Sequence, residues 1–158
     1  MSDAELKRIS ELKDHTFDGI TNPYVPPATL DIARSLKLHS EYDTDLDPVT
    51  FEVVRHGMWN INEEHGGTIQ RISGSPVAMY ALDLNPTIMT EDAEFVYVGP
   101  FMQYMSGVAD TQVKWMLENR SDNPGIADGD MFLANDPWVG AAHQQDVMLI
   151  CPVFWEDQ

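Results

Sequence analysis

The sequence predicts a mixed α/β fold of the α+β kind, built from two long helical segments and several short strands. Apolar residues recur at helical spacing over residues 47–72 and again over 106–119. Short apolar runs at 77–84, 95–98, 131–134 and 147–154 are typical of strands. With 158 residues, of which 43% are hydrophobic, the chain is long enough to form one domain with a core.

Residues 1–46 differ in character from the rest and are expected to form an N-terminal arm. Helical spacing over 4–13 and over 30–38 predicts two short helices, separated by a proline-rich break at 22–27. An arm that binds a partner is the preferred interpretation, and a disordered tail is the alternative. The domain itself is then expected over 47–158.

The best-supported helix begins after Asp47, which is a good N-cap and is followed by Pro48 at the first helical position. Residues 73–76 are expected to end it. His65 lies on its apolar stripe, and a core or interface histidine is favoured over a ligand. The stripe would face the core or a partner helix and consists of Phe51, Val54, Met58, Ile61, His65, Ile69 and Ile72.

Turns are predicted at 123–125 and 128–130. The predicted strands at 131–134 and 147–154 flank the segment 135–146. Cys151 is the only cysteine, so no intramolecular disulfide can form, and it is interpreted as a small core residue. No phosphate-binding or dinucleotide glycine loop and no Gly-x-Ser-x-Gly elbow occurs, so a nucleotide site within this chain is not expected.

Charge and hydropathy limit the partners. The net charge is −17, from 26 acidic and 9 basic residues, which disfavours nucleic acid and anionic membrane surfaces. Neither a signal peptide nor an apolar stretch of membrane-spanning length is present, so a cytoplasmic location is expected.

The segment from Asn135 to Asp146 is the most informative one for function. It combines an Asn-Asp-Pro turn, a run of small residues and a His-x-x-Asp pair, His143 and Asp146. Such a pair can ligate a divalent metal or act in acid/base chemistry, and the plainer alternative is a structural histidine bonded to a carboxylate. Asn135 and Asp136 are the nearest further oxygen donors, and no histidine follows.

Three blocks of the sequence resemble the N-terminal part of the hydantoinase B / acetone carboxylase α-subunit family. They are 47–55 with 63–71, then 116–119 with 123–132, and finally 135–146 with 152–156. The Glu118-Asn119 and Phe154-Trp155-Glu156 pieces are more similar to the acetone and acetophenone carboxylases than to the hydantoinases. The resemblance covers about two thirds of the chain and only the first part of a family member.

The resemblance implies a subunit of an ATP-dependent, biotin-independent ketone carboxylase that forms a β-keto acid from a ketone and bicarbonate and is not active alone. It places His143 and Asp146 as catalytic residues and as ligands of a divalent metal (Mn, Zn or Fe). The third ligand would lie beyond Gln158. Many relatives carry His-x-Gly where this chain has Met105-Ser106-Gly107, which is a second departure from the family pattern.

The implied partners are a hydantoinase-A-like subunit, which would use ATP and Mg, and the remainder of a hydantoinase-B-like subunit, which would complete the sheet. Two other interpretations remain open at this point. One is a subunit of an ATP-dependent cyclic amide hydrolase of the hydantoinase or oxoprolinase type. The other is a non-catalytic scaffold subunit in which the family site is degenerate.

Overall fold

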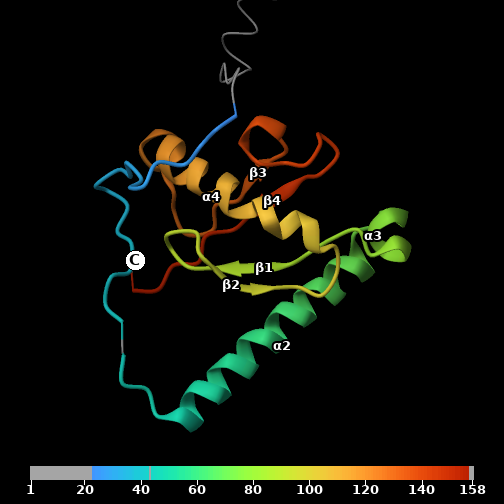
Figure 1. The fold of residues 1–158 in the computed structure, drawn as a ribbon, viewed down its shortest axis with the longest axis horizontal. Helices are drawn as coiled ribbons and strands as arrows, with labels where there is room; N and C mark the ends of the chain where they lie inside the picture. The colour runs from blue at the N-terminus through green and yellow to red at the C-terminus, as the bar shows by residue number, and fades with distance from the viewer. Residues whose placement is uncertain (1–22, 43, 157–158) are drawn as a thin grey trace, which may run out of the picture.

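The structure is a computed structural model that describes residues 23–42 and 44–156. It confirms the mixed α/β fold class (Figure 1). The elements, in chain order, are α2 (Pro48–Ile72), α3 (Pro76–Ala81), β1 (Thr87–Met89), β2 (Phe95–Val98), the 3-10 helix η1 (Gln103–Met105), α4 (Ser106–Arg120), the π-helical turn η2 (Ser121–Gly125), β3 (Phe132–Ala134), the 3-10 helix η3 (Pro137–Val139) and β4 (Met148–Ile150).

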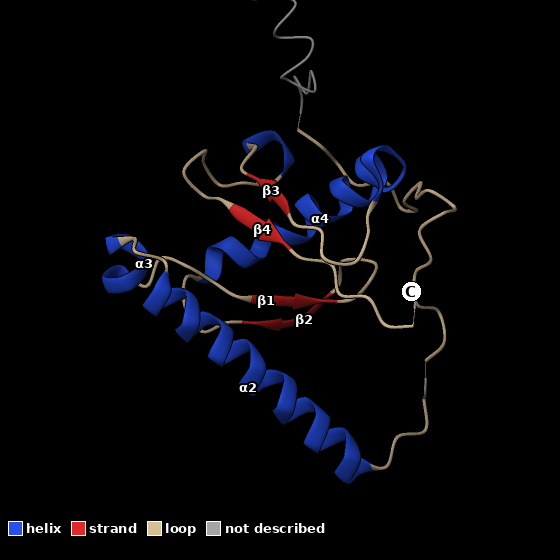
Figure 2. Cartoon of the chain, turned by 180° about the vertical axis from the view of Figure 1, so that it is seen from behind, coloured by secondary structure: helices blue, strands red, loops and turns tan. Residues whose placement is uncertain are grey.

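The described strands form two separate two-stranded antiparallel sheets. In the first, β1 pairs with β2 so that Thr87 faces Val98, with an irregularity between Ile88 and Met89. In the second, β3 pairs with β4 so that Phe132 faces Ile150. Figure 2 shows the two sheets on the same side of α2, with α4 crossing the sheet region.

Helix α2 confirms the helix predicted from its caps. The Asp47 carboxylate accepts a hydrogen bond from the Thr50 amide at 2.9 Å, and Pro48 opens the helix. Gly66 is where the chain approaches closely: a Cβ there would lie 2.4 Å from the Phe101 ring and 2.9 Å from Pro86. Asn62, also buried, donates to the Pro86 carbonyl at 3.3 Å. The helix therefore packs on its own chain through a polar residue and a glycine.

The apolar stripe of α2 is largely exposed instead of buried. Phe51, Val54, Ile61 and Ile72 are all at least half exposed, and Ile61 reaches 63%. His65 is exposed as well, so its interpretation as a core histidine is wrong, whereas an interface role stays a prediction. Figure 1 shows why: α2 runs along one edge of the molecule, and its N-terminal part extends beyond the sheets.

Helix α4 is the centre of the core and confirms the second predicted helix. Three segments pack against α4: residues 23–42, the turn between β1 and β2, and η3. The described residues with the most buried apolar side chains include three from α4, and the full set is Ala78, Leu84, Ala93, Ala109, Met116, Leu117, Val139 and Ala141.

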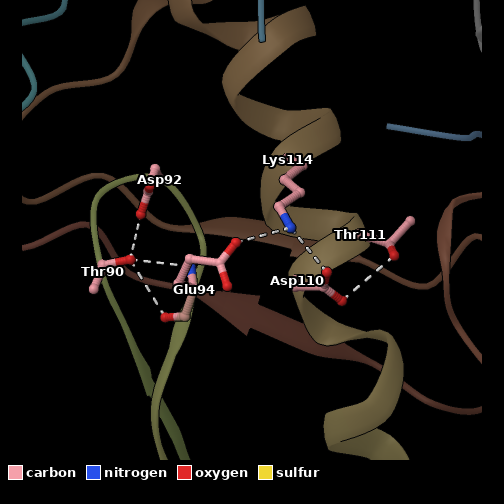
Figure 3. Close-up of polar contacts among 6 residues, drawn as sticks. All are labelled: Thr90, Asp92, Glu94, Asp110, Thr111 and Lys114. Carbon is pink, nitrogen blue, oxygen red and sulfur yellow. Dashed lines mark hydrogen bonds and ion pairs between the residues drawn. The ribbon is translucent and has the colours of Figure 1, made fainter. Parts of the chain in front are cut away.

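An ion-pair network fixes the turn between β1 and β2 to α4 (Figure 3). The Lys114 ammonium lies 3.1 Å from the Asp110 carboxylate and 3.6 Å from that of Glu94. The hydrogen bond from Lys114 to Asp110 is the main cause that raises the pKa of Lys114, so it stays charged at neutral pH. Across the turn, the Thr90 hydroxyl donates to Asp92 at 2.5 Å and accepts from the Glu94 amide at 3.0 Å.

Residues 23–42 form an extended strap over the same chain. The Tyr24 hydroxyl donates to the Glu118 carboxylate, and the Ala33 amide donates to the Ser121 hydroxyl at 2.9 Å. At the other end, the Tyr42 hydroxyl donates to Glu91 in the turn between β1 and β2. At each end of the strap, a tyrosine hydroxyl therefore forms a hydrogen bond to a glutamate carboxylate of the rest of the chain.

The prediction of a helix over 30–38 is wrong. The segment contains only a turn, in which the Leu36 amide donates to the Ala33 carbonyl at 3.0 Å. The Asp31 and Ala33 amides donate to Glu118 of α4 and Ser121 of η2, which hold this segment against the rest of the chain. The helix predicted over 4–13 lies outside the described residues. Partner binding by residues 1–46 stays a prediction.

Three further sequence predictions need correction. The predicted strand over 77–84 is helix α3, because Ser75 caps it by accepting from the Ala78 amide at 3.4 Å and Leu82 ends it in the left-handed region. The predicted strand over 147–154 shortens to β4, with Pro152 following soon after. Cys151 is exposed, so its interpretation as a core residue is wrong.

Candidate functional site

The loop between β3 and β4 carries the His-x-x-Asp pair. Asp136 starts this loop by capping η3, where its carboxylate accepts from the Trp138 amide at 2.9 Å. Asn135 donates its side-chain amide to the Gln144 carbonyl at 2.9 Å, which braces the far side of the loop. These two residues, expected to be the nearest further oxygen donors, therefore hold the shape of the loop.

The run of small residues in this loop serves packing against α4. Gly140 has φ of 105°, a conformation that favours glycine, and a Cβ there would lie 2.8 Å from the Val108 carbonyl oxygen and 3.1 Å from Thr111. Ala141 beside it is buried. Gly140 thus allows the α4 backbone to approach closely, which fixes the base of the loop.

The structure brings His143 and Asp146 together within one turn. The Asp146 amide donates to the His143 carbonyl at 3.0 Å, and the imidazole Nδ1 lies 3.5 Å from the Asp146 Oδ1. That separation is longer than a hydrogen bond but short enough for an ion pair when the imidazole is protonated. The His143 side chain is 55% exposed and that of Asp146 only 14%. The pair therefore presents an accessible ring backed by a mostly buried carboxylate.

Tyr104 is a neighbour of this pair that the sequence did not indicate. Its hydroxyl donates to the Asp146 Oδ1 at 3.4 Å. Partial burial raises the pKa of the Tyr104 phenol, and the negative charges of Asp146 and Asp83 raise it further, so the phenol stays a donor. The only sequence signal was its place, directly before the Met105-Ser106-Gly107 segment that departs from the family pattern.

Among the described residues, two carboxylate oxygens near Tyr104 are buried without a hydrogen-bond partner: Oδ1 of Asp83 and Oδ2 of Asp146. Such atoms are costly unless a ligand, an ion or a proton satisfies them. Asp83 comes from the loop after α3, Tyr104 from η1 and Asp146 from the loop before β4. The three side chains thus converge from separate parts of the chain.

The donor chemistry fits one side of a metal site. Imidazole and carboxylate are ordinary ligands of Mn, Zn and Fe, and Asp146 has an oxygen without a partner. Over residues 23–42 and 44–156, no group of three or more His, Cys, Asp or Glu side chains is placed to hold a metal ion. Within this part of the chain, His143 and Asp146 would supply two ligands, and a further ligand would have to come from elsewhere.

Comparison with known proteins places the chain in a family. The family model described as Hydantoinase B/oxoprolinase matches residues 47–158, and the chain belongs to this family. The match contains the His143–Asp146 loop, α2 and α4. The resemblance inferred from the sequence blocks is therefore confirmed.

Relatives of several kinds match at similar identity. The 5-oxoprolinase 1 of Arabidopsis thaliana is 30% identical over 108 residues, which is 68% of this chain and 8% of that protein. The acetone carboxylase alpha subunit of Xanthobacter autotrophicus is 28% identical over 68% of this chain and 14% of that subunit. A Pseudomonas protein named as the B component of a D-/L-hydantoinase is 26% identical over 77% of this chain and 21% of its own length.

The chain therefore spans less than a quarter of each of these relatives. Oxoprolinases and an acetone carboxylase alpha subunit are matched about equally well, so the comparisons establish the family and do not choose between its reactions. No solved structure matches this chain significantly. Among the described helices, none combines the length and apolar character needed to cross a membrane.

Proposed function

We propose that this chain is the N-terminal part of the hydantoinase-B-like component of an ATP-dependent, biotin-independent ketone carboxylase, of the acetone or acetophenone type. It would act in the cytoplasm as part of a hetero-oligomer. The observation that carries the proposal is the pair in the β3–β4 loop: an accessible imidazole, His143, next to the mostly buried carboxylate of Asp146. The acetone carboxylase alpha subunit among the relatives supports the reaction class.

The chemistry requires stabilisation of enolate charge next to an activated carboxyl group. A base takes the α-proton of the ketone to give an enolate, whose carbon attacks the carbon of bicarbonate that has been activated by phosphorylation. The carbon–oxygen bond to the phosphoryl group then breaks, and inorganic phosphate leaves. A hydantoinase-A-like partner would spend ATP on the activation. A positioned donor at the enolate oxygen lowers the barrier because it acts where negative charge develops. The 55% exposed His143 side chain can reach a substrate oxygen from the loop surface.

Asp146 sets the state of the imidazole. Because Nδ1 faces the carboxylate, the tautomer with the proton on that nitrogen is favoured, and Nε2 on the other edge of the ring would then be the nitrogen that serves a substrate or metal. A divalent metal held by His143 and Asp146 would supply Lewis-acid stabilisation of the enolate oxygen. Without a metal, His143 would itself donate to that oxygen or carry the proton.

An ATP-dependent cyclic amide hydrolase is the second candidate function, favoured by the 5-oxoprolinase and hydantoinase relatives. Substrate dependence of ATP hydrolysis separates the two. With the assembled complex, ketone plus bicarbonate should stimulate ATP hydrolysis and yield a β-keto acid, whereas a lactam or cyclic imide should not. Stimulation by the lactam or imide alone would assign the chain to the hydrolases instead.

His143→Ala in the assembled complex tests the site. At saturating ketone, bicarbonate and ATP, we expect the carboxylation rate to fall by about 100-fold or more, since a general acid/base or charge-stabilising group contributes on that order. If the complex holds a metal, its metal content should fall with the rate. If it holds none, ATP hydrolysis should continue while product formation fails.

The matched control is His56→Ala. His56 is an exposed histidine on α2 whose ring lies 3.6 Å from the Glu52 carboxylate, so it forms a similar histidine–carboxylate pair remote from the β3–β4 loop. Its substitution should leave turnover and coupling unchanged. Wild-type turnover and coupling in His143→Ala would show that His143 is structural, and the non-catalytic scaffold interpretation would then hold.

A further inference from the structure

We propose that Tyr104 is a positioning residue of this site: its hydroxyl holds the Asp146 carboxylate in the orientation that His143 and a bound ligand require. The inference rests on the proposed role of the His143–Asp146 pair. It concerns a residue outside the His-x-x-Asp segment, delivered by the 3-10 helix η1 that leads into α4.

The geometry singles out one oxygen of Asp146. Oδ1 accepts a hydrogen bond from the Tyr104 hydroxyl at 3.4 Å and faces the His143 Nδ1 at 3.5 Å, whereas Oδ2 is buried with no hydrogen-bond partner in the described part of the chain. The hydrogen bond from Tyr104 to Oδ1 restrains rotation of the carboxylate about its last bond. The second oxygen of the carboxylate is thereby kept in a fixed position, as a buried acceptor that lacks a hydrogen-bond partner among the described residues.

The hydroxyl matters because the Asp146 carboxylate has few other constraints. The backbone turn between His143 and Asp146 fixes the main chain, through the amide of Asp146, but leaves the side-chain torsions open. Tyr104 is on a different element, so it ties the β3–β4 loop to the start of α4 across 42 residues of sequence. Partners that orient a ligating or catalytic carboxylate commonly change ligand affinity by about 10- to 100-fold when they are removed.

Tyr104 is not assigned direct contact with substrate. Its side chain is 46% exposed, but its hydroxyl is directed to Asp146, and the nearby Asp83 makes the surroundings negative. A negatively charged enolate or carboxyl group would be repelled there. Removal of the hydroxyl should therefore alter Asp146 and leave the apparent affinity for the ketone unchanged.

The test uses the assembled complex with Tyr104→Phe, which deletes only the hydroxyl. The matched control is Tyr97→Phe, because the Tyr97 hydroxyl also makes one hydrogen bond, to the Arg55 carbonyl at 2.7 Å, away from the site. Binding of Mn²⁺ is measured by equilibrium dialysis, and product formed per ATP is measured over a range of ketone concentrations. For Tyr104→Phe we expect about tenfold weaker Mn²⁺ binding, less product per ATP and an unchanged KM for the ketone. Tyr97→Phe should match the wild type.

A double-mutant cycle with Asp146→Asn separates positioning from a general structural effect. A neutral amide receives a weaker hydrogen bond than a carboxylate, so the effect of Tyr104→Phe should shrink to less than about threefold in the Asn background. A full tenfold effect in that background, or no effect of Tyr104→Phe on either readout, would overturn the proposal.

Failure of the proposed function gives a different pattern. If the wild-type complex binds no Mn²⁺, the metal role of His143 and Asp146 fails, and the cycle is evaluated from product per ATP alone. If a lactam or cyclic imide is the substrate, the ketone assignment fails, and the same cycle is run with that substrate. A complex that is inactive with both substrate classes would overturn the proposed function and the role of Tyr104 together.

Discussion

Helices α2 and α4 differ in how their side chains are used, although both were predicted from the same kind of periodicity. Helix α4 lies at the centre of the molecule, where Ala109, Met116 and Leu117 are buried and Gln112 is buried with them. Helix α2 is ten residues longer, yet its buried residues are Asn62 and Gly66. The helix with the stronger apolar stripe thus contributes less to the core of this chain.

The exposed stripe of α2 has a regular spacing. Its residues recur at three- and four-residue steps, which is the pattern of a seam that packs against another helix. The outer face of the β3–β4 hairpin is also apolar, with Leu133 and Leu149 facing each other and both exposed. Strands that are apolar on both faces are normally covered on both. The exposed apolar surfaces of α2 and of the β3–β4 hairpin are therefore expected to be covered by other parts of a larger assembly.

Substitution of equivalent apolar residues in the two helices gives the largest contrast. Leu117→Ala in α4 removes a side chain that is only 5% exposed, so we expect a loss of about 2–5 kcal/mol in the free energy of unfolding. Ile61→Ala in α2 should cost the chain less than about 1 kcal/mol but weaken assembly with partner subunits. Urea dependence of protease resistance measures the first effect, and co-purification from one cell extract measures the second.

Exchange of the two effects would contradict the different roles of α2 and α4. A large loss of stability in Ile61→Ala, with assembly intact, would mean that the α2 stripe is covered within the chain. Unchanged assembly and unchanged stability would mean that the stripe is simply a tolerated surface.

Local signals in the sequence predicted the elements well where one residue type has one structural use. Asp47 with Pro48 fixed the start of α2, and the Asn135–Asp146 segment was correctly placed between two strands. The Ser75-Pro76 pair, in contrast, was interpreted as the end of a helix, although it also starts α3. The same dipeptide serves both purposes, because Ser75 follows α2 and also caps α3.

What the sequence could not supply were contacts between distant segments. Tyr104 meets Asp146 across 42 residues, and Tyr24 meets Glu118 across 94. No periodicity or motif connects such pairs. The residues of the candidate site that lie within one loop, His143 and Asp146, could therefore be found from the sequence, whereas the residue proposed to position them could not.

A glycine at the base of the β3–β4 loop and a glycine on α2 differ in how closely other atoms surround them. Gly140→Ala places a Cβ 2.8 Å from a backbone carbonyl of α4 and at a positive φ. We expect a loss of about 1–3 kcal/mol in the free energy of unfolding and a shifted His143–Asp146 loop. Gly57→Ala on α2, where no atom lies within 4 Å of the added methyl, should stabilise slightly by about 0.5–1 kcal/mol.

These two glycine variants are compared by the midpoint of urea-dependent protease resistance and by Mn²⁺ binding in the assembled complex. Equal effects of the two substitutions would show that the loop adapts freely, and the close packing of Gly140 on α4 would then have no part in holding the site.

The strap gives the smallest expected effect, and it tests whether α4 also depends on residues before the family domain. Tyr24→Phe removes the hydroxyl that donates to Glu118, while the Tyr24 amide keeps its hydrogen bond to the Trp138 carbonyl at 2.7 Å. Loss of one partly buried hydrogen bond should lower the free energy of unfolding by about 1 kcal/mol.

Burial, together with the Glu118 carboxylate, raises the pKa of Tyr24, so the bond persists at neutral pH and is lost only in strongly alkaline solution. Because the folded-state pKa is raised, this contribution to stability is fully present below the ordinary tyrosine pKa of about 10 and decreases above it.

Hydrogen exchange of amides in residues 24–36 measures the effect of Tyr24→Phe on the strap, with the exposed Tyr80 changed to Phe as the control. Exchange should accelerate along the strap in Tyr24→Phe and stay unchanged in the control; equal exchange in both variants would show that the Glu118 contact does not hold the strap on α4.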